Sequence, residues 1–276
     1  MTYVRNGWSL VRNQFPSVII LFLYQLLWGL FLYRIVDTGV TTFLSRYPDP
    51  PPNGLSRVLF ILEGQYELLH SSEIRTYIWL LIGMIAIRML LTPFIQAGIL
   101  YGLTPVDSRK SGLTLLRGMK EFWKPVLLFF LLELILISMP LLWILPKLYA
   151  LWPSLVYTGG GILPILKACG YLLGWFSYCF LIRQCLLFTL FGYLFKKGAW
   201  GSLWLGIKHI LPGITIFLIL GGAVAVIFLI FGSISWVWTG LLALILQQTF
   251  PFFRCLFNVW GITSQFQLWY SKSQNS

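Results

Sequence analysis

The sequence predicts an all-α polytopic membrane protein, because it is too apolar for a water-exposed surface and its apolar residues form long stretches. Of its 276 residues, 58% are hydrophobic and only 10% are charged, whereas a soluble domain has about 25% charged residues. Aromatic residues reach 17%, which is typical of proteins that place Trp and Tyr at both membrane interfaces. Lipid is therefore the predicted solvent for most of the chain.

Six apolar stretches are long enough to cross about 30 Å of hydrocarbon as helices. The first follows two arginines, as in a signal peptide, but it is long and lacks a small-residue cleavage site, so we interpret it as an uncleaved span. The second, fourth and sixth exceed the required length, and Pro93 and Pro251 are candidate kinks in the second and sixth. The predicted spans are Ser17–Arg34, Ile74–Tyr101, Pro125–Leu145, Leu163–Phe195, Pro212–Phe231 and Ser235–Tyr270.

The distribution of basic residues predicts the orientation of these spans. The second connection is short and rich in Lys and Arg, and the fourth connection and both ends of the chain add further basic residues on the same side. The side richer in basic residues is expected to be cytoplasmic, which places both termini in the cytoplasm and the protein in a bacterial plasma membrane. The net charge of +12 fits this asymmetry and contact with anionic lipid headgroups. It does not indicate nucleic-acid binding, because no nucleic-acid motif is present.

One substantial segment, from Asp37 to Glu73, is predicted on the external side. The run Pro48–Pro52 must be extended, because proline cannot continue a helix. Apolar residues then recur at helical spacing, which predicts an amphipathic helix either on the outer interface or over the mouth of the bundle. These residues are Leu55, Val58, Leu59, Leu62, Tyr66 and Leu69.

An internal repeat of helix pairs is predicted from two recurring patterns. The odd-numbered spans follow a short amphipathic piece that begins with glycine, carries a basic residue and ends with proline, and proline is tolerated in the first turn of a helix. The even-numbered spans each contain one arginine that is followed by apolar residues and a glycine. The amphipathic pieces are Gly7 to Pro16, Gly118 to Pro125 and Gly206 to Pro212. A single membrane domain, 1–276, would then contain repeat units of about 1–103, 104–197 and 198–270.

The three arginines inside the even-numbered spans are the candidate functional residues. A charge at the centre of a membrane helix costs about 2.5–3.5 kcal/mol, and only one acid, Glu133, lies clearly within a span as a candidate ion-pair partner. Two interpretations remain open: the arginines reach the headgroups or tie helices together, or they converge on a polar cavity and bind an anion bidentately. The second predicts an anion- or lipid-binding site formed by Arg88, Arg183, Arg254, Gln96, Gln247 and Gln248.

The glycine-to-proline pieces and the even-numbered spans that end in small residues resemble a group of bacterial six-span integral membrane domains. This group includes the membrane domain fused to some glycerophosphodiester phosphodiesterases and uncharacterised relatives. The resemblance covers most of the chain and implies a six-span membrane fold. It implies no phosphodiesterase activity, because the sequence contains no such catalytic domain.

We therefore expect a transporter-like or permease-like protein that binds an anionic solute or lipid headgroup. A non-catalytic scaffold or accessory subunit of a larger complex is the alternative, and a membrane-embedded enzyme is a third. No catalytic residue is predicted, because paired intramembrane carboxylates and known nucleophile motifs are absent from the sequence. We expect no metal site and no cofactor. The expected partners are membrane lipids. Whether other membrane subunits also bind is left open, and no nucleic acid is expected.

Overall fold

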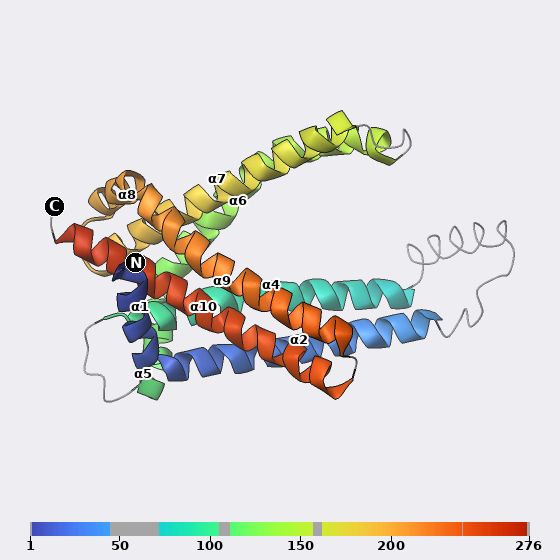
Figure 1. Cartoon of the computed structure of the whole chain (residues 1–276), viewed down its shortest axis with the longest axis horizontal. Helices are drawn as coiled ribbons and strands as arrows, with labels where there is room; N and C mark the ends of the chain where they lie inside the picture. The colour runs from blue at the N-terminus through green and yellow to red at the C-terminus, as the bar shows by residue number, and fades with distance from the viewer. Residues whose placement is uncertain (1, 45–71, 105–110, 157–161, 239, 275–276) are drawn as a thin grey trace, which may run out of the picture. The chain divides into compact units, whose positions relative to one another are not determined.

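The computed structural model describes residues 2–44, 72–104, 111–156, 162–238 and 240–274. Within these ranges every regular element is a helix and no strand is found, which confirms the predicted all-α class. The chain divides into two compact units. The smaller unit is Ile19–Thr92, and the larger unit combines Met1–Val18 with Pro93–Ser276. Figure 1 shows the helices of both units.

A short helix followed by two long helices occurs three times along the described chain. This is the order that three duplicated units would produce, although the repeat and its boundaries stay predictions. The helices are α1 (Thr2–Asn13), α2 (Phe15–Leu44), α4 (Ser72–Tyr101), α5 (Ser111–Glu121), α6 (Trp123–Val156), α7 (Ile162–Leu194), α8 (Ala199–Lys208), α9 (Ile210–Val237) and α10 (Leu241–Ser273).

Helices α2, α4, α6, α7 and α9 each contain a segment that is long and apolar enough to cross a membrane. Because their side chains are mostly exposed, apolar residues face outward along these helices, as expected where lipid replaces water. The chain is therefore an integral membrane protein, whereas the specific membrane and the side of the termini stay predictions. The segments are Phe15–Gly39, Arg75–Tyr101, Trp123–Leu151, Leu163–Leu194 and Ile210–Trp236.

The sixth predicted span needs a correction, because Ser235–Tyr270 contains a helix boundary. Helix α9 continues to Val237, and α10 begins only at Leu241. Gly240 between them has a φ of 121°, a conformation that glycine adopts readily and that ends a right-handed helix. Helix α10 has 33 residues but is not among the five apolar segments, because glutamines, an arginine and an asparagine interrupt its apolar residues.

The connection that was predicted to be external overlaps the end of a helix. Helix α2 continues through Asp37 to Leu44, because the residues after Arg34 include no helix-breaking proline and only one glycine before the described range ends. The predicted extended run Pro48–Pro52 and the amphipathic helix after it lie outside the described residues. Pro93 and Pro251, the candidate kinks, lie inside the continuous helices α4 and α10.

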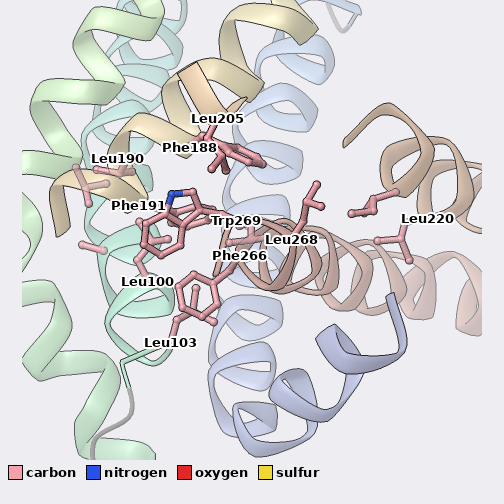
Figure 2. Close-up of a cluster of buried hydrophobic side chains, with 14 residues drawn as sticks. Leu100, Leu103, Phe188, Leu190, Phe191, Leu205, Leu220, Phe266, Leu268 and Trp269 are labelled. Atoms are coloured by element: carbon pink, nitrogen blue, oxygen red, sulfur yellow. The ribbon is translucent and has the colours of Figure 1, made fainter. Parts of the chain in front are cut away.

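A cluster of buried aromatic side chains joins α7, α8 and α10 in the larger unit, as Figure 2 shows. The Phe191 ring lies 5.5 Å from the Phe266 ring and 5.8 Å from the Trp269 ring, measured between centroids. The indole Nε1 of Trp269 donates a hydrogen bond of 3.1 Å to the Ser202 hydroxyl on α8. Buried aromatic residues contribute large apolar areas, so this cluster stabilises the packing of α7, α8 and α10 against one another.

Each short helix packs through a glycine against one of the long helices that carry the three arginines. Gly118 of α5 lies against Tyr101 on α4, and Gly206 of α8 lies against Phe188 on α7. Gly7 of α1 lies against Ser264, on α10. Because these glycines have no Cβ, the helix backbones approach closely, as in other small-residue contacts between membrane helices.

Candidate functional site

The three predicted arginines lie on three different long helices, and all three side chains are exposed. Arg88 is on α4, Arg183 on α7 and Arg254 on α10. None of the described residues forms an ion pair with any of them. Arg88 belongs to the smaller unit and the other two belong to the larger unit, so the prediction that all three share one cavity stays a prediction.

Arg88 occupies the deepest position of the three along its apolar segment. It lies midway along the 27-residue segment Arg75–Tyr101. At a rise of about 1.5 Å per residue, its Cα is roughly 20 Å from either end of the segment. This distance is longer than an arginine side chain, so snorkelling alone does not bring the guanidinium to either end of the segment.

Tyr24 of α2 lies close in register to Arg88 and carries a hydroxyl that can hydrogen-bond. Gly39 on α2 faces Tyr77 on α4, where an added Cβ would lie 3.8 Å from the Tyr77 ring. Counting back along α2 and forward along α4 from this contact brings Tyr24 to within about one turn of Arg88. The charge of Arg88 acts electrostatically on the Tyr24 hydroxyl.

The Tyr24 hydroxyl oxygen is buried and has no hydrogen-bond partner among the described residues. The Tyr24 ring is stacked 6.2 Å from the ring of Trp28, measured between centroids. Trp28 is one turn further along α2. The sequence analysis did not identify Tyr24, because a tyrosine in an aromatic-rich apolar helix carries no distinctive pattern. Only the position of Arg88 on the neighbouring helix distinguishes it.

Arg183 has an acidic neighbour on the helix that packs beside it. Helices α6 and α7 run antiparallel, and the Tyr178 hydroxyl donates a hydrogen bond of 3.3 Å to the Leu136 carbonyl. From this contact, Glu133 lies within about one turn of Arg183, and the two charges influence each other. Glu133 is half-buried. The structure thus places the predicted ion-pair candidate beside one particular arginine.

Arg254 has no comparable polar neighbour on α9. The rings of Phe228 and Phe250 lie 5.3 Å apart, and those of Phe231 and Phe253 lie 5.8 Å apart. This register places Arg254 opposite the part of α9 around Ile227, where the sequence is entirely apolar apart from glycine. The helix register therefore places a hydroxyl near Arg88, a carboxyl group near Arg183 and an apolar surface near Arg254.

The three glutamines predicted to accompany the arginines are not brought together by any described contact. Gln96 is half-buried and Gln248 is exposed, while the side chain of Gln247 lies outside the described residues. A different glutamine, Gln184, is only 2% exposed. Its amide lies against Gly213, and its Nε2 has no hydrogen-bond partner among the described residues. The prediction for the first three stays a prediction.

Comparisons with known proteins do not assign the chain to a family. No protein family, curated protein or solved structure matches the chain. The resemblance to the membrane domains fused to phosphodiesterases therefore stays a prediction. Within the described ranges, no group of three or more His, Cys, Asp or Glu residues is placed to hold a metal ion. The chemistry around the individual arginines consists of a hydroxyl near Arg88 and a carboxyl group near Arg183.

Proposed function

We propose that this integral membrane protein is transporter-like or permease-like and binds an anionic group through its intramembrane arginines. The observation that carries the proposal is the position of Arg88, whose exposed side chain lies midway along a 27-residue apolar segment. Arginine stays protonated under physiological conditions, so this charge must be balanced by an anion, carbonyl groups or water. A bound anion would balance it directly.

The charges inside the apolar helices support this proposal. Glu133 is near Arg183, which leaves Arg88 and Arg254 without an acidic partner among the described residues. A planar guanidinium presents two parallel N–H donors to a phosphate or a carboxylate, and such charge-assisted bonds are stronger than bonds between neutral groups. Phosphate or carboxylate is therefore the chemistry that these helices are suited to bind.

The exposure of the arginine side chains favours a lipid headgroup over a soluble anion as the source of that group. A lipid reaches an exposed residue laterally, within the bilayer, whereas a soluble anion requires a water-filled path to the same depth. Both sources present the same anionic oxygens to the guanidinium. We therefore propose an anionic phospholipid as the leading ligand, and a binding measurement can separate the two sources.

The proposal can be tested with single Arg88→Gln, Arg183→Gln and Arg254→Gln variants. Purified protein is titrated with phosphatidylglycerol and with zwitterionic phosphatidylcholine, and native mass spectrometry counts the bound lipids. Inorganic phosphate, followed by calorimetry, serves as the soluble anion. We expect preferential binding of phosphatidylglycerol, with a loss of roughly tenfold or more in at least one variant, because a charged hydrogen bond contributes about 1.5–3 kcal/mol. Uptake or lipid-exchange measurements in vesicles then test movement.

Arg75→Gln is the matched control for these variants. Arg75 lies on the same helix as Arg88 but at the end of the apolar segment, so its replacement removes the same charge at the membrane surface. If all three intramembrane variants bind phosphatidylglycerol and phosphate as the unmodified protein does, the proposal is wrong. A scaffold role, which requires no bound anion, would then be the better interpretation of the same helices.

A further inference from the structure

We infer that Tyr24 and Arg88 together form the anion-binding subsite, with the hydroxyl of Tyr24 and the guanidinium of Arg88 donating to one phosphate or carboxylate group. This inference rests on the proposed function and deepens it, because it selects one arginine of the three and adds a residue from another helix. Both residues belong to the Ile19–Thr92 unit.

The first support is the unused hydrogen-bonding capacity of Tyr24. Its hydroxyl oxygen is buried without a partner among the described residues. A buried polar group that lacks a hydrogen bond is unfavourable, and most such groups in proteins have a partner. A phenol hydroxyl donates one proton, and an anion held by the neighbouring guanidinium would accept it.

The second support is that both groups lie at the same depth on neighbouring helices. The contact between Gly39 and Tyr77 sets the register of α2 and α4, which brings Tyr24 to within about one turn of Arg88. Trp28, one turn further along α2, stacks on the Tyr24 ring and limits its movement. A cation and a neutral donor from two helices thus lie close enough in register to bind one anion together, whereas two cations would repel each other.

The third support is the difference between Arg88 and the other two arginines. Arg183 has the Glu133 carboxyl group within electrostatic range, so an acidic neighbour within the protein is available to it. Arg254 faces an apolar part of α9 and has no second donor there. Arg88 alone, among these three, combines an unpaired charge with an unpaired hydroxyl on the helix beside it.

The test compares Tyr24→Phe and Arg88→Gln with two matched controls. Tyr24→Phe keeps the ring and its stacking on Trp28 and removes only the hydroxyl. Tyr33→Phe makes the same change on the same helix at a side chain that is 69% exposed, and Arg75→Gln removes the same charge from α4 at the end of its apolar segment. Each purified variant is titrated with phosphatidylglycerol and with inorganic phosphate, and its thermal unfolding is recorded.

We expect Tyr24→Phe to weaken binding roughly ten- to hundredfold, as the loss of a hydrogen bond to a charged group implies. Arg88→Gln should weaken it at least as much, while both controls bind normally. Parallel losses for phosphatidylglycerol and for phosphate identify a site for any phosphate group; a loss for the lipid alone identifies a headgroup site.

Two results would overturn this inference and leave the proposed function standing. In one, Arg88→Gln loses binding while Tyr24→Phe binds normally, so the hydroxyl has no role. In the other, binding is lost in Arg183→Gln or Arg254→Gln but not in Arg88→Gln, so the site lies elsewhere. Normal binding in all three arginine variants would overturn the proposed function and this inference together.

Discussion

The carbonyl of Leu136 on α6 lacks its usual helical donor, because the residue four positions later is Pro140, which has no N–H. The Tyr178 hydroxyl on α7 donates to this carbonyl at 3.3 Å. In hydrocarbon a free carbonyl is unfavourable, and a side chain from a neighbouring helix commonly satisfies it. A proline on one helix thus creates the acceptor that a tyrosine on the next helix uses.

Replacing Tyr178 with phenylalanine should therefore destabilise the protein by about 1 kcal/mol, the typical net contribution of one hydrogen bond. In a Pro140→Ala background the loss should be smaller, because the alanine N–H can bond to the Leu136 carbonyl within α6. Unfolding of the four proteins in detergent measures both effects. Equal losses in the two backgrounds would show that Tyr178 acts through packing and not through this carbonyl.

Sequence could identify the arginines but not the partners that they face. An arginine in an apolar stretch is conspicuous, because its cost in hydrocarbon demands compensation. Tyr24 is one of 13 tyrosines, and its hydroxyl becomes informative only once the register of α2 and α4 is known. The same holds for Glu133: sequence predicted an ion-pair partner, and the register of α6 and α7 placed it beside Arg183.

At the scale of helices, glycines decide where the short helices pack. Gly118 on α5 is buried against Tyr101, and an added Cβ would lie 3.0 Å from the Gly98 Cα on α4. Gly170 on α7 has no neighbouring atom within 4 Å of an added Cβ. The two positions are both helical and differ mainly in the space around them.

Gly118→Ala should destabilise the protein, because backbone atoms on α4 would have to move, as in other overpacked interfaces, at a cost of about 1–3 kcal/mol. Gly170→Ala should be neutral or stabilise the protein by up to about 1 kcal/mol through helix propensity. Thermal or denaturant unfolding of both variants checks the comparison. Similar effects at the two positions would mean that α5 does not depend on this close approach.

The ends of elements were predicted less well than their existence. Five predicted spans coincide with long apolar helices, because length and hydropathy determine whether a segment can cross a membrane. The boundary between α9 and α10 was predicted too early, between Phe231 and Ser235, because apolar residues lie on both sides of Gly240. Hydropathy remains high through that turn, and only the backbone conformation at the glycine reveals it.

At the scale of the whole chain, the sequence predicts the class of fold but not how the helices pack. In a soluble helix, the apolar face identifies the side that meets the core. Here the side chains that face lipid and those that face other helices are both apolar. Trp200 is 84% exposed and Trp269 is fully buried, yet nothing in their local sequence distinguishes them.

One contact links parts of the chain that are far apart in sequence. The Trp260 indole on α10 donates a hydrogen bond of 2.8 Å to the Val4 carbonyl on α1, and its ring lies 4.8 Å from the Trp8 ring. During translation, α1 leaves the ribosome long before α10 is made. At about 5–20 residues per second, it waits roughly 10–50 s for the helix against which it packs.

Biogenesis of this protein therefore cannot finish helix by helix from the N-terminus. Val11 on α1 is fully buried, so a cysteine introduced there, in a background without the native cysteines, should resist a thiol reagent in the full chain. In a chain stopped after Trp238 it should react readily, because α10 is missing. Equal protection in both chains would show that α1 docks before its partner emerges. Protection in the full chain alone would show that α10 is the helix that holds α1 in place.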